Sequence, residues 1–188
     1  MKAPCTLAAL IERSALQFEA AHLAGQLSFG QGTTNAHDEA AWLVLWQLGL
    51  PLDTDFTAPE HDVAVSDAQV DAVQNLLTRR IASRQPAAYL TREAWLQGVP
   101  FTVDERVIVP RSFIAELIAD GGFDAWLGAQ TQRALDLCTG NGSLAVLAAL
   151  AWPELQIDAT DISCDALAVA RLNVQRHGLA GRIRLIES

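Results

Sequence analysis

The sequence lacks the run of about 20 apolar residues that a membrane-spanning helix needs. Its hydrophobic runs are far shorter, and Lys2 alone does not make the basic start of a secretory signal peptide. Hydrophobic residues nevertheless make up 51% of the 188 residues, which is enough for a sizeable core in one or two domains. We therefore expect a cytoplasmic protein without a membrane partner.

Cysteine and histidine are also scarce. The three cysteines, Cys5, Cys138 and Cys164, are an odd number without the spacing of metal ligands, and the four histidines show no such spacing either. This favours reduced thiols and predicts neither a disulfide framework nor a metal site. No histidine lies close in sequence to Cys138 or Cys164, so we interpret both as small core or turn residues rather than nucleophiles.

Lysine and arginine are missing between Arg13 and Arg79. The same stretch contains nine acids: Glu19, Asp38, Glu39, Asp53, Asp55, Glu60, Asp62, Asp67 and Asp71. With a net charge of −9, the chain has no non-specific attraction to nucleic acid, and we expect no direct binding to it. The acidic stretch is either a solvated face or a docking surface for a basic protein.

The first ninety residues predict three helices. Thr6 is a candidate N-cap for the first, and residues 36–48 form the second, which Gly49 ends. The third begins at Ser66, where Gln69 three residues on completes a capping box. We predict a small helical domain over residues 1–93, followed by a β-hairpin linker over residues 94–111.

Strands and helices alternate in the remainder, residues 112–188. A short helix is expected after Ser112, strands at 134–138, 155–160 and 183–186, and helices at 144–151 and 164–177. This alternation predicts an α/β domain with a parallel sheet and right-handed crossovers. Three strands are too few for a finished sheet of this kind, so we expect the domain to be incomplete at its C-terminal side.

A glycine-containing turn joins the first of these strands to its helix. It runs from Asp136 through Thr139, Gly140 and Asn141 to Gly142. Glycines there let the backbone approach a ligand closely, at the strand ends where such folds bind ligands. A tight turn without any ligand is the alternative interpretation.

Two cofactors fit this turn. The Gly-x-Gly-x-x-Ala spacing from Gly140, with Asp161 further on, also matches a nicotinamide dinucleotide site. Asp136 favours S-adenosylmethionine, because a carboxylate repels a pyrophosphate but attracts an ammonium and a sulfonium. Asp161 would accept hydrogen bonds from the ribose hydroxyls, and Ile162 would lie against the adenine. Asp161 could instead be the N-cap of the next helix, a position for which Ser163 is equally placed.

The segment Val103–Ser112 contains a second candidate. Pro110 fixes the backbone and Arg111 follows at a helix entrance. From these residues alone, an ordinary strand-to-helix turn with a surface arginine is an equal interpretation.

Three motifs together resemble the N5-glutamine methyltransferases. They are Val-Asp-Glu-Arg-Val-Ile-Val-Pro-Arg-Ser at 103–112, Leu-Asp-Leu-Cys-Thr-Gly-Asn-Gly-Ser at 135–143, and the run from Asp158 to Asn173. The resemblance covers the chain from about Ala36 onward. It is closest to the branch called PrmB, which modifies a glutamine on large-subunit ribosomal protein three. The sister branch, PrmC or HemK, modifies a release-factor glutamine, and it favours glycine at the position of Cys138.

The resemblance implies a helical substrate-recognition domain and a Rossmann-like methyltransferase domain. The loop residues Asp136, Thr139, Gly140, Asn141 and Gly142 would bind the cofactor, with Asp161 and Ile162 at its nucleoside. Pro110 and Arg111 would lie near the active-site mouth. The implied partner is a basic ribosomal protein.

The family's catalytic motif, Asn-Pro-Pro-Tyr, occurs nowhere in the 188 residues, and the nearest asparagines, Asn141 and Asn173, lack the prolines. We therefore assign no catalytic residue and predict that this chain alone is inactive and at best a weak cofactor binder. Three alternatives stay open: a release-factor methyltransferase, a nicotinamide oxidoreductase and a non-catalytic protein-binding fragment.

Overall fold

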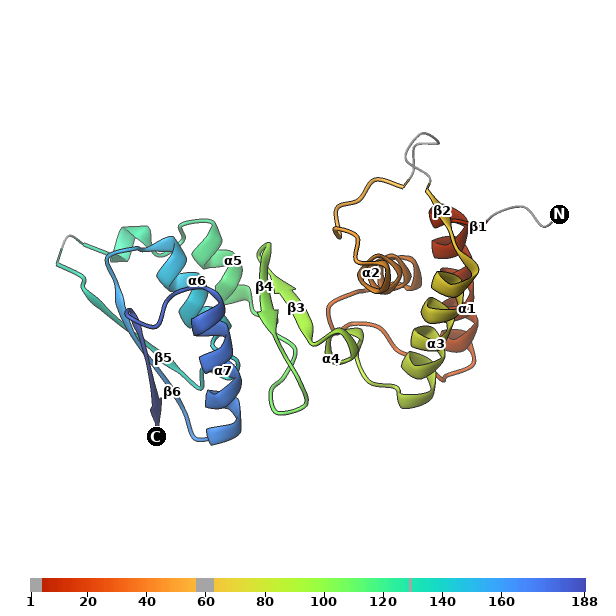
Figure 1. Cartoon of the computed structure of the whole chain (residues 1–188). Coiled ribbons are helices and arrows are strands. Elements are labelled where there is room, and N and C mark those ends of the chain that lie inside the picture. The colour runs from red at the N-terminus through yellow and green to blue at the C-terminus, as the bar shows by residue number, and fades with distance from the viewer. Residues whose placement is uncertain (1–4, 57–62, 129) are drawn as a thin grey trace. The chain divides into compact units, whose positions relative to one another are not determined.

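The computed structural model describes residues 5–56, 63–128 and 130–188 (Figure 1). The chain divides into two compact units, and the boundary falls between Thr91 and Arg92. The sequence prediction had ended the helical domain two residues later, at residue 93.

The first unit is built from helices. Its elements are β1 (Cys5–Thr6), α1 (Leu7–Leu23), α2 (Ala36–Leu48), β2 (Ala64–Val65), α3 (Asp67–Ser83) and α4 (Ala87–Thr91). The hydroxyl of Thr6 accepts a hydrogen bond from the Ala9 amide, and Gly49 ends α2 in the left-handed conformation, with φ of 68°. Ser66 and Gln69 form the expected capping box. The pairing of β1 with β2, and helix α4, had no signal in the sequence.

The core of the first unit lies between α1, α2 and α3. Helix α2, seen end-on in Figure 1, crosses the other two. Phe18 of α1, Leu43 of α2 and Val73 of α3 have no exposed surface. Helical periodicity in the sequence indicates core positions for Phe18 and Val73, whereas the burial of Leu43 is decided by how α2 packs between the other helices.

One member of the acidic stretch is not on the surface. Glu39 is only 2% exposed, and its Oε1 lies 2.8 Å from Nε of Arg80, which is also 2% exposed. The interpretation of nine acids as one surface feature is therefore wrong for Glu39, because a buried carboxylate needs a buried partner. Glu60 and Asp62 lie outside the described residues.

The second unit contains a hairpin and an α/β layer. Its elements are β3 (Glu93–Leu96), β4 (Val99–Thr102), α5 (Phe113–Ala119), a 3-10 helix (Asp124–Trp126), β5 (Arg133–Leu137), α6 (Ser143–Ala151), β6 (Gln156–Asp161), α7 (Cys164–Arg176) and β7 (Ile183–Glu187). Strands β5, β6 and β7 pair in parallel in that order. This is the parallel sheet that the alternating pattern predicted, in a Rossmann-like class I arrangement.

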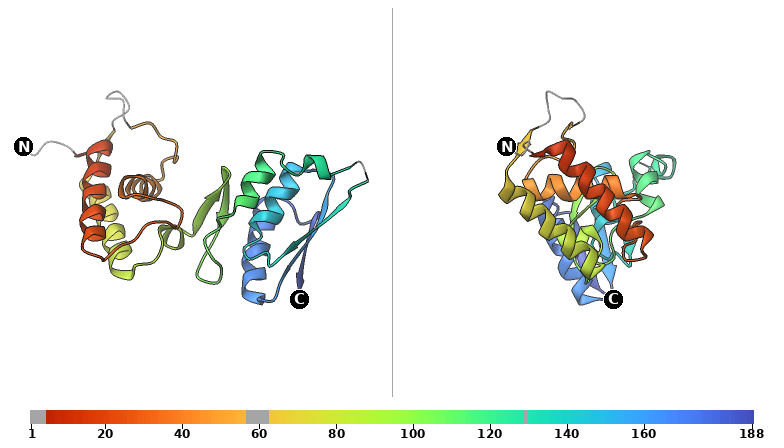
Figure 2. Two further views of the ribbon diagram at one scale, coloured as in Figure 1. Left: turned by 180° about the vertical axis from the view of Figure 1, so that it is seen from behind. Right: turned by 90° about the vertical axis from the view of Figure 1, so that its right-hand side faces the viewer.

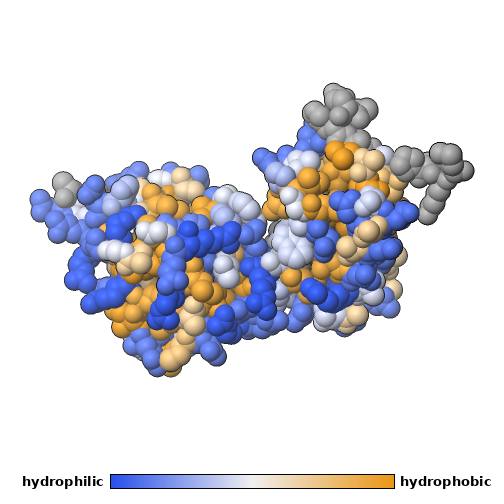
Figure 3. All heavy atoms as spheres, viewed as in Figure 1, coloured by the Kyte–Doolittle hydropathy of each residue, from blue (hydrophilic) through white to orange (hydrophobic). Residues whose placement is uncertain are grey.

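The three helices α5, α6 and α7 lie on one face of this sheet (Figures 1 and 2). Ala134 and Ile157 pack into the core on that face. On the opposite face, Leu135 and Leu137 of β5 are 61% and 67% exposed. Hydrophobic surface is visible on this unit in Figure 3. The described part of the chain thus covers only one face of the sheet, whereas parallel sheets are usually buried on both.

The hairpin β3–β4 belongs to the second unit and is not a separate linker. Gln97 and Gly98 at its tip have φ of 51° and 73°, as a two-residue hairpin turn of type I′ requires. Phe101 of β4 is fully buried in the core of this unit. Nε2 of His177 lies 2.9 Å from the Pro100 carbonyl oxygen. Burial of Phe101 and polar contacts with α7 together attach the hairpin to this unit.

Candidate functional site

Three residues of the loop between β5 and α6 have positive φ angles. Cys138, Gly140 and Gly142 have φ of 58°, 57° and 79°. The Thr139 amide donates to the Thr160 carbonyl at 2.8 Å, and the Gly142 amide donates to the Thr139 carbonyl at 2.9 Å. Cys138 carries the cost of a Cβ in this conformation, which residues other than glycine rarely adopt. The loop therefore turns sharply at the carboxyl end of the sheet, as the glycine spacing predicted.

The two glycines of the loop have different surroundings. A Cβ added to Gly142 would lie 3.2 Å from Cβ and 3.4 Å from Cα of Ala170 in α7. A Cβ added to Gly140 would meet no atom within 4 Å. Gly142 therefore permits the close approach of α7, whereas Gly140 faces open space beside the loop.

Alanine at these two positions is expected to separate backbone strain from packing. Gly140→Ala should lower the free energy of unfolding by about 1–2 kcal/mol, the cost of a left-handed alanine. Gly142→Ala should cost more, because Ala170 is fully buried and has no room to withdraw. Urea denaturation of both variants measures the difference. Equal losses would show that contact with Ala170 contributes nothing.

Asp136 is a partly buried carboxylate on β5. Its Oδ2 accepts a hydrogen bond of 2.6 Å from the Thr139 hydroxyl. Burial raises the pKa of Asp136, the hydrogen bond from Thr139 lowers it, and the charge of Asp161 raises it further, so that the net effect is a raised pKa. A cation placed beside Asp136 would relieve both unfavourable contributions.

Asp161, at the end of β6, closes the same loop. Its Oδ2 accepts from the Gly140 amide and its Oδ1 from the Ser163 amide, both at 2.9 Å. Ser163, and not Asp161, caps α7 by accepting from the Ala166 amide. The structure thus decides between the two capping interpretations, and leaves Asp161 bound to the glycine loop.

These contacts disfavour a dinucleotide. A pyrophosphate in such a loop is held by free backbone amides at the helix N-terminus. Here the Gly140 amide is already occupied by a carboxylate, and a second carboxylate, Asp136, lies in the same loop region. The residues present therefore fit a cationic ligand with hydroxyl groups better than a phosphate.

Two further predicted residues differ in accessibility. Ile162, which follows Asp161, is 85% exposed and is free to contact a ligand. Asn141 is only 4% exposed, and its Oδ1 accepts from the Ser143 amide at 3.2 Å. Its Nδ2 is buried without a hydrogen-bond partner among the described residues. Asn141 thus shapes the loop from within.

A groove follows the outer edge of β5. It has a volume of about 340 Å³ and is lined by ten residues: Ile114, Ile118, Ala134, Leu135, Asp136, Leu137, Leu144, Ala145, Ala148 and Ile157. A larger groove, about 580 Å³, lies at the amino ends of the strands, among Arg133, Asp158 and Arg184. We assign the site to the carboxyl ends despite this difference in size, because parallel sheets bind ligands there.

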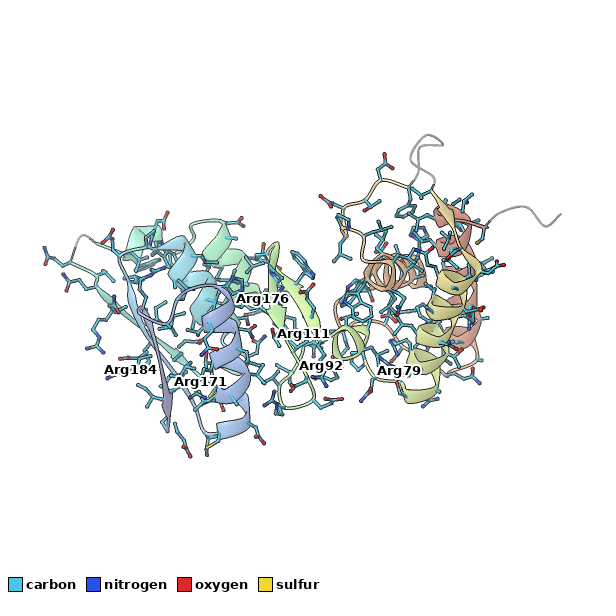
Figure 4. The ribbon with its side chains drawn as sticks, viewed as in Figure 1. Arg79, Arg92, Arg111, Arg171, Arg176 and Arg184 are labelled. Carbon is cyan, nitrogen blue, oxygen red and sulfur yellow. The ribbon has the colours of Figure 1, made fainter. Side chains whose placement is uncertain are left out.

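The predicted mouth residues lie in the loop between β4 and α5. Pro110 is buried, and Arg111, labelled in Figure 4, is exposed. Earlier in this loop, the pKa of Arg106 is raised, first by its hydrogen bond to Asp104 and also by the charge of Asp165. Asp165 is in the first turn of α7, so the negative charge that acts on Arg106 comes from the helix that begins beside Asp161.

The sequence prediction gave no role to Asn173 of α7. Asn173 has no exposed surface and bonds to both the hairpin and the glycine loop. The available signal was an asparagine on the buried stripe of a helix, at the spacing of Ala166 and Ala170. Buried polar side chains of this kind need defined partners.

Cys138 and Cys164 are both exposed, which rules out the core position that the sequence left open for them. The pKa of Cys164 is raised, chiefly by its hydrogen bond with Glu187. No three histidine, cysteine or acidic side chains gather to hold a metal ion within the described ranges. None of the described helices combines the length and apolarity needed to cross a membrane.

Comparison with known proteins agrees with the methyltransferase resemblance of the sequence. Residues 123–188 match the family model of the methyltransferase small domain. A "Ribosomal protein uL3 glutamine methyltransferase" of Burkholderia pseudomallei is 52% identical over 162 residues, which is 85% of this chain and 52% of the relative. The protein of the same name from Neisseria meningitidis is 51% identical over 164 residues, 86% of this chain and 53% of the relative.

The chain therefore spans about half the length of the curated relatives it matches. Among solved structures, the N-terminal domain of human METTL16 in complex with SAH aligns with 69% of this chain and with 47% of the METTL16 chain. The sequence identity is 13% and the TM-score is 0.38. That likeness is too low to bear on function.

Proposed function

Because this chain is a homologue of the ribosomal protein uL3 glutamine methyltransferases, we propose that the whole protein transfers a methyl group from S-adenosylmethionine to a glutamine side chain of uL3. The observation that carries the proposal is the identity of about half the residues over 85% of the chain. Asp136 and Asp161 independently support the cofactor in this proposal, since two carboxylates suit S-adenosylmethionine and oppose a dinucleotide. We place this activity in the cytoplasm, in agreement with the three free cysteines.

In this proposal the glycine loop holds the cofactor, which supplies the methyl group. Asp136 accepts hydrogen bonds from the ammonium of its methionine part, and Thr139 fixes the rotamer of Asp136. Asp161 accepts from the ribose hydroxyls while the Gly140 and Ser163 amides hold it still. Exposed Ile162 provides an apolar surface for the adenine. These residues bind and orient; none of them needs to transfer a proton.

Catalysis needs more than these residues. An amide nitrogen is a poor nucleophile, so the enzyme must orient it toward the methyl group with groups that accept its hydrogens. The Asn-Pro-Pro-Tyr motif, which the family uses for this purpose, is absent from the 188 residues. We therefore propose that this chain contributes cofactor binding and substrate docking, and that it does not transfer methyl groups alone.

The first unit supplies the docking surface in this proposal. Asp38, Asp53, Asp67 and Asp71 are exposed on it. An acidic surface attracts a basic ribosomal protein and speeds its association, an effect that salt screens. Glu39 takes no part, since it is buried against Arg80.

Two measurements test the proposal. S-adenosylhomocysteine at about 100 times its dissociation constant should stabilise the protein by about 2.7 kcal/mol, and NAD should leave the melting temperature unchanged. The whole protein should then label uL3 from methyl-labelled cofactor, and should not label a release factor. Stabilisation by NAD would favour an oxidoreductase, and labelling of the release factor would favour the sister branch. Turnover by the 188-residue chain alone would refute its proposed inactivity.

A further inference from the structure

The side chain of Asn173 joins three parts of the second unit that are distant in sequence. Its Oδ1 accepts from the Thr102 amide at 2.7 Å. Its Nδ2 donates to the Thr102 carbonyl at 3.0 Å and to the Asn141 carbonyl at 2.8 Å. Both hydrogens of the amide are therefore used, and neither end of the group can be exchanged for an apolar one without loss.

The two partners of Asn173 lie at functionally different places. Thr102 is the last residue of β4, directly before the segment that contains Pro110 and Arg111. Asn141 lies between the two glycines of the cofactor loop. Ala170, one turn before Asn173 on α7, is the residue that Gly142 approaches closely. One face of α7 thus supports the loop by packing at Ala170 and by hydrogen bonding at Asn173.

We propose that Asn173 is a positioning residue that holds the cofactor loop to the end of β4, so that cofactor binding orders the segment leading to Arg111. The inference rests on the proposed function, since it gives the loop a cofactor. It adds a residue that touches no ligand and acts through the Asn141 carbonyl. Other contacts attach the hairpin to α7, including that of Arg176, labelled in Figure 4, with Glu93 at 2.6 Å, but they do not reach the loop.

The test is Asn173→Leu in the whole protein, compared with Val174→Ala. Leucine has a similar shape and removes all three hydrogen bonds. Val174 is the next residue, 3% exposed in the hydrophobic core, so its truncation lowers stability without changing a polar contact of the loop. Affinity for S-adenosylhomocysteine, measured by calorimetry where both variants are folded, should fall about tenfold in Asn173→Leu. It should change less than about threefold in Val174→Ala.

Amide hydrogen exchange separates positioning from stability. In the wild type, S-adenosylhomocysteine should slow exchange in residues 99–104 as well as in 139–145. In Asn173→Leu the response of residues 99–104 should vanish while that of the loop persists at saturating ligand. Asn173→Ser, which keeps a donor hydroxyl, replaces the leucine variant if that one does not fold. Near-wild-type affinity together with a retained response in residues 99–104 would overturn the inference.

The control for the underlying function is the wild type itself. If it binds no S-adenosylhomocysteine, the proposed function fails. Exchange without ligand then still decides whether Asn173 joins the loop to the hairpin. Faster exchange of both the Thr102 and the Gly142 amides in Asn173→Leu would support the link, and faster exchange of Thr102 alone would refute it.

Discussion

Replacing Arg80 by methionine is expected to lower the free energy of unfolding of the first unit by about 3–5 kcal/mol. Nε of Arg80 lies 2.8 Å from Oε1 of Glu39, and Nη2 donates to the Ser28 carbonyl at 3.0 Å. The Thr33 hydroxyl donates to the other oxygen of Glu39 at 2.8 Å. Removing the arginine leaves a carboxylate buried without its counter-charge, and most of the cost is the desolvation of that charge.

Two companion variants make this measurement specific. Glu39→Met together with Arg80→Met should be less destabilising than Arg80→Met alone, because no unpaired charge remains. Arg84→Met removes an arginine that donates to the Gly25 carbonyl at 2.8 Å in an exposed position, and should cost less than about 1 kcal/mol. Urea denaturation followed by hydrogen exchange in α1, α2 and α3 reports on the first unit. A double variant as unstable as Arg80→Met would contradict the explanation.

Asp136→Asn is expected to weaken S-adenosylhomocysteine binding by about 10- to 100-fold, the contribution of a hydrogen bond to a charged group. The same change should stabilise the protein without ligand at neutral pH. The pKa of Asp136 is raised above its ordinary value of 3.8, chiefly by burial, so its ionised form is less favourable in the folded than in the unfolded state. Asparagine removes that charge and can still accept the Thr139 hydrogen bond.

The raised pKa also fixes the sign of a pH dependence. Between the ordinary value of 3.8 and the higher value in the folded state, the folded protein binds more protons at Asp136 than the unfolded chain does. The contribution of Asp136 to stability is therefore present below this window and is lost as the pH rises through it. Ligand binding should respond oppositely and weaken as the pH falls, because only the ionised carboxylate attracts the ammonium.

Asp158→Asn is the matched control. Asp158 lies in β6 and bonds to Arg133 and Arg184, at the end of the sheet away from the glycine loop. Hydrogen bonding, first from Arg184, lowers the pKa of Asp158, so its loss should destabilise the protein and leave ligand affinity unchanged. Unchanged affinity in Asp136→Asn, or an equal loss in Asp158→Asn, would show that Asp136 does not bind the cofactor.

Local signals in the sequence predicted most of the helices, the strands of the parallel sheet and the glycine loop, but not helix α4 or the β1–β2 pair. Thr6, Asn35, Ser66 and Ser163 each accept a hydrogen bond from an amide three residues later, so these caps are decided within one turn of chain. Alternation of strands and helices predicted a parallel sheet. The carboxyl ends of parallel strands meet at one edge of the sheet, so the same alternation places Asp136 and Asp161 near the same loop.

Contacts between distant residues were decided only by the tertiary structure. Glu39 and Arg80 are 41 residues apart, and Thr102 and Asn173 are 71 apart. No sequence pattern around Glu39 or Arg80 distinguishes Glu39 from the exposed acids near it, because the burial of Glu39 depends on how α2 and α3 pack. The sequence alone therefore determined which residues form the glycine loop. The packing of α7 determined which loop residues are held in place. Ala170 packs closely against Gly142, and the Asn173 side chain donates a hydrogen bond to the Asn141 carbonyl.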